Sequence, residues 1–524
     1  MARTPIAAAL SRIVSSVAGS MQGEPGTAAA GPARCTVLKG AGALAAGLAV
    51  PVGTAATALP AHAAPPGGGA APRIVVVGAG LAGLSAAYQL QQAGYTSTVV
   101  EASDRVGGRC WTVDGCFEDG QVAEHGGELI DQGHTHIRQL SQSLGLRLDN
   151  LLSAEQNGTE PIYFFDGAPY TYAEATQDIK AIWQQLHSDV SAASYPTTYL
   201  ISTPRGRELD AMSITTWIKN YVPGGLKSRL GQLLDVAYNI EYGGESTVQS
   251  SLNMLYLLAY SGQGQMRIFG PSNEKYHVRG GNQQITDRMA SILGRQVTTG
   301  TRLVALARRS DGSWTVTTQA GGTTSSRIAD HVVLALPFSL LRSVDLTKAG
   351  FPALKMTAIR QLSMGTNSKL QLQFTDRHWR TLGGNGDTFA DTGYQSSWEV
   401  TRAQPGAQGI LIDYTGGTIG ASFTGSPDAH ARTFLAQIEP VFPGISRRWN
   451  GKVTLDFWPA HPYTLGSYSY WKVGQYTAFS GVEGEAVGTC HFAGEHTSQD
   501  YQGYLNGAVE TGYRAAAEIL AALK

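Results

Sequence analysis

The hydrophobic pattern is most distinctive near residue 75, where a β-branched run leads into regularly spaced glycines. Residues 74–77 form this run, and three glycines follow with the spacing G-x-G-x-x-G: Gly78, Gly80 and Gly83. An apolar-rich stretch continues to Leu90, and a second β-branched run at 98–100 ends at Glu101. This order predicts a strand, a tight turn, a helix and a second strand.

Strand-like and helix-like patterns continue to alternate along the rest of the chain. Residues 297–306 and 314–318 alternate like the two strands of a hairpin, with an Asp-Gly turn between them. Residues 329–337 read as a buried strand stopped by a proline, and residues 369–374 as an alternating strand. The C-terminal pattern predicts a helix that starts near Gly503.

These patterns predict an α/β fold in which one domain is inserted into another. A Rossmann-like dinucleotide-binding domain is expected from three separate segments: 73–150, 272–345 and 450–524. An inserted α+β substrate domain is expected from two segments: 151–271, which is largely helical and rich in aromatic residues, and 346–449. The aromatic residues have two interpretations: they form a wall around a substrate, or they pack in the core. For any single ring, core packing is the preferred interpretation.

The first 72 residues are rich in Ala, Gly, Pro and Ser and are not expected to fold with the rest. A charged stretch from Arg34 to Lys39, a short apolar run at 41–50 and Ala-His-Ala at 61–63 resemble an export signal with a cleavage site. Cys35 stands where a twin-arginine signal has its second arginine. Export to the periplasm or the medium is the prediction. The alternative is a disordered, unprocessed tail on a cytoplasmic protein.

Composition narrows the functional classes. The chain has 524 residues, of which 42% are hydrophobic and 15% charged, and its net charge is −1. A nearly neutral chain does not favour binding to nucleic acid or to an anionic membrane, and the apolar run at 41–50 is too short to span a bilayer. Four cysteines without a C-x-x-C pair make a zinc site unexpected, and free thiols are favoured over a Cys110–Cys116 disulfide.

The glycine-rich turn has the chemistry of a dinucleotide site. The first glycine allows the turn, the second lets the backbone approach a pyrophosphate, and the third lets the helix pack on the strand. Glu101 is placed to accept hydrogen bonds from a ribose. Arg105 and Arg109 follow in a glycine-rich loop, and a guanidinium binds phosphate oxygens bidentately. The alternative is a glycine-rich turn that binds nothing.

Four stretches together resemble the flavin amine oxidase family, from about Arg73 to Lys524. They are the fingerprint with Glu101, the Arg-Val-Gly-Gly-Arg loop at 105–109, Lys369 on its strand, and Phe-Ala-Gly-Glu at 492–495 continuing to Gly-Tyr-Leu-Asn-Gly-Ala at 503–508. The resemblance implies a bound FAD. Glu101 would hold the adenosine ribose, Arg109 with Gly80 the diphosphate, Val304 the adenine and Glu495 the ribityl–phosphate side.

The resemblance also implies the catalytic residues. Lys369 matches the family lysine that reaches the flavin through a water, and Tyr468 and Tyr504 match two tyrosines that form a cage in front of the flavin. The alternative for Lys369 is a surface lysine on an edge strand. The full predicted cofactor site comprises Gly78, Gly80, Gly83, Glu101, Arg105, Gly108, Arg109, Gly126, Gly127, Glu128, Leu129, Val304, Gly494, Glu495, Gly503, Tyr504 and Leu505.

Two departures from the family pattern refine the expectation. Ser467 stands where covalent monoamine oxidases have a cysteine, so FAD is expected to be bound non-covalently. L-amino-acid oxidases carry an arginine shortly after the glycine pair, whereas here Gly127 runs into Glu128, Leu129 and Ile130. The substrate is therefore expected to lack an α-carboxylate. Glu128 is expected either to attract a cationic substrate tail or only to bond nearby backbone or flavin.

The predicted function is oxidation of an amine to an imine, which water hydrolyses, with reduction of dioxygen to hydrogen peroxide. An L-amino-acid oxidase is the first alternative. A flavin desaturase, or an FAD-binding redox protein without a tuned amine substrate, is more distant. The expected partners are a small-molecule amine and dioxygen, with no nucleic acid and no stable membrane span, and a homodimer is left open.

Overall fold

The computed structural model describes residues 71–260, 262 and 265–524. The predicted export signal and Cys35 lie outside these residues, so export stays a prediction, as does a homodimer. Within the described part, no helix is both long and apolar enough to span a bilayer. Cys110, Cys116 and Cys490 are free thiols, as the sequence favoured.

The first sheet is parallel and has the order β21-β13-β1-β2-β9. Its strands are β1 (Ile74–Val77), β2 (Ser97–Val100), β9 (Val297–Thr298), β13 (His331–Leu334) and β21 (Cys490–Phe492). β1 lies between β13 and β2, with Ile74 facing both His331 and Ser97. The helix after the glycine turn is α2 (Leu81–Gln92), so the predicted strand, turn, helix and second strand are confirmed.

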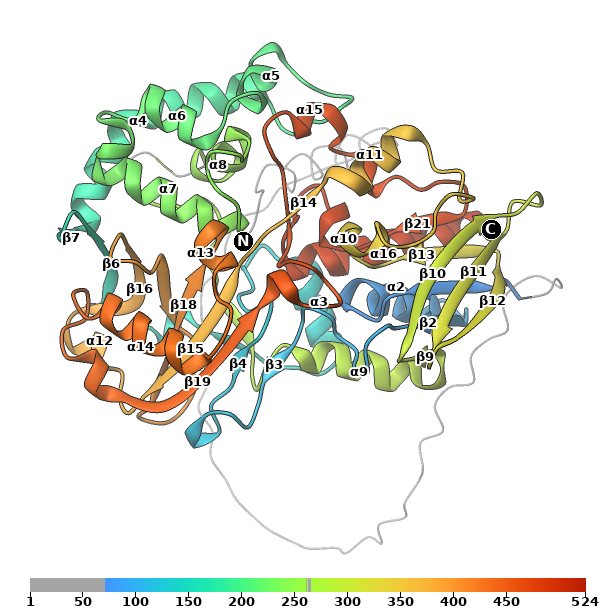
Figure 1. Cartoon of the computed structure of the whole chain (residues 1–524), viewed down its shortest axis with the longest axis horizontal. Coiled ribbons are helices and arrows are strands. Elements are labelled where there is room, and N and C mark those ends of the chain that lie inside the picture. The colour runs from blue at the N-terminus through green and yellow to red at the C-terminus, as the bar shows by residue number, and fades with distance from the viewer. Residues whose placement is uncertain (1–70, 261, 263–264) are drawn as a thin grey trace, which may run out of the picture. The chain divides into compact units, whose positions relative to one another are not determined.

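Both faces of this parallel sheet are covered, which explains why β1 is an unbroken apolar run. Ile74 and Val76 join a core with residues of α2 and α16 (Leu505–Ala522), whereas Val75 and Val77 join a core that contains Trp314. Trp314 belongs to a three-stranded antiparallel sheet of β10 (Thr301–Arg308), β11 (Trp314–Ala320) and β12 (Thr323–Ala329), at the right of Figure 1. Successive side chains of β1 thus point to opposite faces of the sheet and pack in different cores.

The stretch predicted as one strand at 297–306 is divided in two. Residues 297–298 form β9 in the parallel sheet, and β10 starts at Thr301 in the antiparallel one. Gly300 lies between them with a φ of +64°, a conformation that favours glycine and redirects the chain. The hairpin of β10 and β11 is otherwise as predicted, with Arg308 facing Trp314.

The second large sheet has seven strands in the order β19-β15-β18-β17-β16-β6-β7. They are β6 (Glu160–Phe165), β7 (Ala168–Tyr170), β15 (Ser368–Phe374), β16 (Gly384–Ala390), β17 (Ser396–Glu399), β18 (Gly409–Thr415) and β19 (Trp449–Phe457). β19 starts at residue 449, the position of a predicted domain boundary, and pairs with β15. The assignment of the five segments to two domains stays a prediction.

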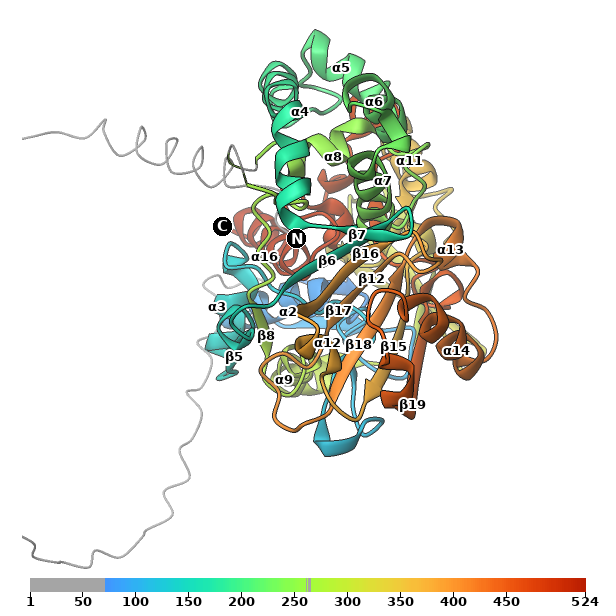
Figure 2. The ribbon, with the colours of Figure 1, turned by 90° about the vertical axis from the view of Figure 1, so that its left-hand side faces the viewer.

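A group of five helices, α4 to α8, lies next to this sheet and is coloured green in Figure 2. They are α4 (Tyr172–Ala193), α5 (Pro204–Asp210), α6 (Ile214–Tyr221), α7 (Arg229–Tyr242) and α8 (Ser251–Leu258). α4 and α7 both contact β6. The other longer helices are α3 (Thr135–Ser143), α9 (Gln283–Leu293), α11 (Ala353–Gln361) and α14 (Pro427–Ile438). Short two-stranded ladders join β3 (Thr112–Val113) to β4 (Ala123–Glu124), β5 (Leu148–Asn150) to β8 (Tyr276–Val278), and β14 (Ser363–Met364) to β20 (Ser469–Tyr470).

Candidate active site

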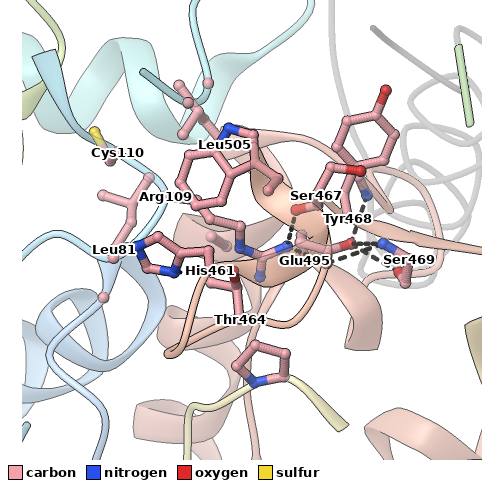
Figure 3. A pocket seen from close by; sticks show the side chains of 18 of the residues that line it. Leu81, Arg109, Cys110, His461, Thr464, Ser467, Tyr468, Ser469, Glu495 and Leu505 are labelled. Atoms are coloured by element: carbon pink, nitrogen blue, oxygen red, sulfur yellow. Dashed lines mark hydrogen bonds and ion pairs between the residues drawn. The ribbon is translucent and has the colours of Figure 1, made fainter. Parts of the chain in front are cut away.

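A cavity of about 740 Å³ lies between residues of the parallel sheet and residues of the seven-stranded sheet. It is lined by every predicted site residue except Gly83, and Figure 3 shows part of its wall. The structure therefore brings together predicted site residues that are up to 427 positions apart along the chain, from Gly78 to Leu505.

The three glycines of the fingerprint have different surroundings. A Cβ added at Gly80 would meet nothing within 4 Å, so this glycine leaves open space at the cavity. A Cβ added at Gly83 would lie 1.9 Å from the carbonyl oxygen of Gly78, which has a φ of +100°. Gly83 therefore allows the helix to pack on the turn, and Gly80 leaves room for a ligand, as the spacing predicts.

Glu101 is held at the end of β2. The Ala79 N–H donates to Glu101 Oε2 at 2.7 Å, and the N–H and hydroxyl of Ser103 each donate to Oε1 at 2.9 Å. These bonds fix the carboxylate beside the glycine turn, and a carboxylate has room for further donors. This position is compatible with a ribose ligand.

The two arginines of the glycine-rich loop have different partners. Arg105 donates to the carbonyls of Val106 and Gly108 and lies 3.9 Å from the ring centre of Trp111, so it shapes the loop itself. Arg109 donates to Glu495 at 2.7 Å and to the Ser467 carbonyl at 2.8 Å. Burial, followed by the two guanidinium charges, lowers the pKa of His461 on the same wall to about 4. This wall is positively charged, which suits a diphosphate.

Glu495 joins three segments of the cavity wall, and Figure 3 shows its contacts with Arg109 and Ser469. Besides Arg109 it accepts hydrogen bonds from the hydroxyl of Ser469 at 2.8 Å and from the N–H of Gly503 at 2.9 Å. Burial alone would raise its pKa, but the Arg109 charge and these donors hold the pKa below its ordinary value. The carboxylate is thus ionised, and through the Gly503 N–H it holds the residues that lead into α16.

The N-terminus of α16 opens into the cavity through Tyr504, Leu505 and Ala508. It comes close to the loop at 126–127, since a Cβ added at Gly127 would lie 2.7 Å from the Leu505 side chain. A helix N-terminus presents unpaired N–H groups and favours negative charge. This matches the predicted position beside the flavin ring.

Val304 lies at an irregularity of the antiparallel sheet. The pairing of β10 with β11 runs through Leu303 and resumes at Ala305, so Val304 is skipped, and its carbonyl instead accepts from the Asp345 N–H at 2.9 Å. A bulge of this kind redirects one residue out of the ladder. Val304 lines the cavity, where the family resemblance places an adenine contact.

One row of side chains across the seven-stranded sheet forms a wall of the cavity. In the strand register, Lys369 faces Tyr414, Tyr414 faces Ser396, Ser396 faces Phe389 and Phe389 faces Tyr163. All five line the cavity. Facing residues lie on the same side of a sheet, and each strand adds about 4.8 Å, so the row from Lys369 to Phe389 spans roughly 14 Å.

Lys369 is a buried residue of a central strand, which overturns the alternative of a surface lysine on an edge strand. Its ammonium donates to Glu128 Oε2 at 2.8 Å and to the Gly126 carbonyl at 3.1 Å, while the Trp398 indole donates to Glu128 Oε1 at 2.9 Å. Both oxygens of Glu128 are therefore bonded within the protein. These bonds fit the alternative that Glu128 bonds nearby groups, and whether it also attracts a cationic substrate tail stays a prediction.

The two predicted cage tyrosines line the cavity, and their hydroxyls are bonded. The Tyr468 hydroxyl lies 2.8 Å from that of Tyr414 and donates to the Ile240 carbonyl at 3.1 Å. The Tyr504 hydroxyl donates to Glu241 at 3.1 Å. A Cβ added at Gly503 would lie 3.6 Å from the Tyr468 ring, so this ring packs against the start of α16. Ser467 donates to Asn367 at 2.6 Å.

Sequence reasoning missed five residues of this wall: Trp398, Tyr414, Glu241, Glu274 and Asp387. Tyr414 and Trp398 belong to apolar strands, and the cavity contact depends on a strand register that the sequence does not show. The three acidic residues carry no motif.

The chain matches the profile of the family described as flavin containing amine oxidoreductase over residues 81–520. This match covers most of the chain.

The chain belongs to this family. It is similar to nicotine dehydrogenase of Pseudomonas putida, with 27% identity over 85% of the chain and 88% of that protein. It is also similar to polyamine oxidase 1 of Zea mays, with 26% identity over 86% of the chain and 90% of that protein.

Solved structures confirm the fold of a flavin amine oxidase. Cyclohexylamine oxidase from Brevibacterium oxydans superposes with a TM-score of 0.75 at 22% identity, covering 87% of the chain and 100% of that structure. Putrescine oxidase bound to putrescine gives 0.72 at 22% identity, covering 86% and 99%. The predicted α/β, Rossmann-like class is thereby confirmed.

The residues present fit FAD, the cofactor of this family. The open space at Gly80, the positive wall at Arg109, the carboxylate at the end of β2 and the α16 N-terminus all face one cavity. The chain is a flavin-dependent amine oxidase that converts an amine to an imine and reduces dioxygen to hydrogen peroxide. The roles of individual residues and the non-covalent attachment of FAD stay predictions.

Proposed function

We propose that the substrate is an amine without an α-carboxylate. The observation that supports this proposal is the pairing of the cations along the cavity. Four arginine and lysine residues line it: Arg105, Arg109, Arg302 and Lys369. Within the described residues each has an acceptor: loop carbonyls for Arg105, Glu495 for Arg109, Gln319 for Arg302 and Glu128 for Lys369.

A substrate carboxylate would have to displace one of these acceptors or remain unpaired, which costs several kcal/mol when a charge is buried. Arg279 pairs with Asp149 on the surface. The wall from Tyr414 to Tyr163 is instead aromatic, and Glu241, Glu274 and Asp387 also line the cavity. These groups favour an amine or ammonium over a carboxylate.

The residues of the wall position the amine and control its proton. FAD, when bound, would supply the acceptor for the two electrons that the amine loses when its C–N bond becomes a C=N bond. The rings of Tyr468 and Tyr504 would orient the amine, and their apolar faces favour its neutral form. Lys369, held by Glu128 and the Gly126 carbonyl, keeps a fixed ammonium near the reacting end, where it can order a water.

Steady-state kinetics with matched pairs tests the proposal: tyramine against tyrosine, and phenethylamine against phenylalanine. The amine of each pair should have the higher kcat/KM by at least about tenfold, which is roughly 1.4 kcal/mol of discrimination. A higher kcat/KM for the amino acids would place the enzyme with the L-amino-acid oxidases.

A further inference from the structure

The last turn of α7 lies behind the two predicted cage tyrosines. Ile240, Glu241 and Tyr242 of this turn line the cavity. The Tyr468 hydroxyl donates to the Ile240 carbonyl at 3.1 Å, and the Tyr504 hydroxyl donates to Glu241 Oε1 at 3.1 Å. Both hydroxyls therefore bond to neighbouring residues of one helix, and one of these residues carries a carboxylate.

Glu241 is buried together with the hydroxyl that binds it. The residue is 4% exposed, and its second carboxylate oxygen, Oε2, is buried as well. Oε1 accepts from Tyr504, which lines the cavity. The Tyr504 hydroxyl is thus the contact that joins the carboxylate to the cage.

Two other carboxylates of the cavity wall are held by cations. Glu128 is paired with Lys369, and Glu495 is paired with Arg109. A carboxylate in a close ion pair is a weaker base, because the cation stabilises its ionised form. Glu241 instead accepts from a hydroxyl of the cage. Its position and this bond make it the carboxylate suited to take a proton from a group between the rings.

The other titratable groups near Glu241 are mainly tyrosines. Burial raises the pKa of three of them, and the negative charge of Glu241 adds to this effect. They are Tyr238 on α7, Tyr414 on β18 and Tyr468 on the segment before β20. The Tyr504 ring lies 5.2 Å from the ring of His134, which contacts Asp131 at 3.3 Å. A phenol with a raised pKa stays neutral, so these tyrosines do not compete with Glu241 as bases.

We propose that Glu241 accepts, through the Tyr504 hydroxyl, the proton that the substrate ammonium loses before it is oxidised. This inference rests on the proposed position of the amine between the rings of Tyr468 and Tyr504, and it adds the route of the proton. An N–H bond of the ammonium breaks and its proton bonds to the Tyr504 oxygen. At the same time the original Tyr504 O–H bond breaks, and that proton bonds to Glu241 Oε1. The products are a neutral amine and a neutral carboxylic acid, Tyr504 is unchanged, and no electrons are transferred.

Two physical reasons support this route. The separation of 3.1 Å between the Tyr504 oxygen and Glu241 Oε1 is within the range over which a base takes a proton. The transfer also replaces two buried charges, an ammonium and a carboxylate, by two neutral groups, which avoids the cost of keeping ions out of water. The neutral amine then has the lone pair that a C=N bond requires.

The first test counts the protons released when the holoenzyme binds α,α-dimethylphenethylamine. This amine cannot become an imine, because the carbon next to its nitrogen has no hydrogen. Titration calorimetry at about pH 7.5, in buffers that differ in ionisation enthalpy, measures the count. Wild type should release almost no proton, since the proton stays on Glu241. Glu241→Gln and Tyr504→Phe should each release about one proton per amine, because only the neutral amine then enters the cage.

The second test is the pH profile of kcat/KM for phenethylamine. Wild type should give nearly constant values between the pKa of a carboxylate and that of the ammonium, since both partners of the transfer are then charged. In Glu241→Gln the values should follow the neutral amine and rise about tenfold per pH unit below the pKa of the ammonium. At about pH 7.5 this variant should lose at least about tenfold. The loss should be smaller for β,β-difluorophenethylamine, whose fluorines make its ammonium more acidic.

Glu245→Gln is the matched control. Glu245 belongs to the same segment, accepts from the Asn239 amide at 3.0 Å and from the Thr418 N–H at 2.6 Å, and lies outside the cavity lining. Its replacement removes a nearby carboxylate without touching the cage. The proton count and the pH profile should both remain those of wild type. Glu241→Gln itself keeps an acceptor for the Tyr504 hydroxyl, so the cage should stay in place.

Equal proton release in wild type and either Glu241→Gln or Tyr504→Phe would overturn this route, as would a loss of kcat/KM in Glu241→Gln that is the same at every pH. Either result would leave the proposed function in place. A wild-type enzyme that oxidises phenylalanine in preference to phenethylamine would overturn the proposed function itself.

Discussion

The buried pair of Glu128 and Lys369 shows how single residues connect the fold to the chemistry. The sequence resemblance assigns Lys369 to the flavin. The structure places it in a central strand, 3% exposed, with Glu128 as its ion-pair partner. Removing one member of a buried pair leaves the other charge uncompensated.

Lys369→Met should therefore lower both activity and stability. Turnover should fall by at least about tenfold if the ammonium serves the reaction. The free energy of unfolding should fall by about 3 kcal/mol, because Glu128 keeps only the Trp398 donor. Thermal and denaturant unfolding measure the second effect.

The double variant Lys369→Met with Glu128→Gln is the control. It removes both charges and should recover most of the lost stability while remaining slow. Unchanged stability in the single variant would show that the pair carries little energy, and a fast double variant would show that Lys369 has no part in turnover.

At the scale of elements, two glycines of the turn between β1 and α2 have different roles, one in helix packing and one at the ligand space. Gly83 packs α2 against the Gly78 carbonyl, and Gly80 faces open space at the cavity. The spacing of the glycines was sufficient to predict the packing at Gly83 and the open space at Gly80, because both follow from backbone geometry alone.

Gly80→Ala and Gly83→Ala should consequently have different effects. Gly80→Ala should fold with nearly wild-type stability, since its φ is −71°, but it should bind FAD more weakly because its methyl group enters the diphosphate space. Gly83→Ala should destabilise the apoprotein itself, because the added methyl collides with backbone. Flavin content after dialysis and apoprotein unfolding distinguish them, and equal losses in both measurements would contradict this division of roles.

Other features of the elements could not be predicted from the sequence. The division at Gly300 depends on two sheets meeting at one turn, and a local pattern of alternation does not show where a strand changes sheets. The row from Lys369 to Tyr163 joins strands in the order β15-β18-β17-β16-β6, and neither this order nor the register follows from local periodicity. Tyr414 and Glu274 became visible as cavity residues only through these long-range arrangements.

At the scale of the whole molecule, the buried Lys355, which has no part in the proposed site, makes the free energy of unfolding depend on pH. Lys355 is 1% exposed and donates to the backbone carbonyls of Val482, Glu483 and Glu485. Burial lowers its pKa to about 8 from 10.5, against the opposing charge of Glu483. Between these two pH values the unfolded chain binds the proton that the folded protein has released, so this residue adds stability as the pH rises.

Wild-type protein and Lys355→Met should therefore differ in their pH dependence. The stability difference, wild type minus variant, should increase between pH 8 and pH 10.5 by up to about 3 kcal/mol, because one pKa unit corresponds to 1.36 kcal/mol. Below pH 8 Lys355 is protonated in both the folded and the unfolded state, so it should not change this stability difference. Urea unfolding at several pH values measures it, and a difference that falls as the pH rises would contradict the lowered pKa.

The family and the cofactor region were predictable because they rest on local motifs, whereas the substrate end rests on contacts between distant segments. The proposed function is that this flavin amine oxidase acts on amines and not on amino acids. Anaerobic titration of the purified holoenzyme tests it most directly, by recording the oxidised flavin absorbance as tyramine or tyrosine is added. Tyramine should bleach the flavin much faster than tyrosine, and admitting dioxygen should restore the colour with formation of hydrogen peroxide. Faster bleaching by tyrosine, or no bleaching by any amine, would contradict it.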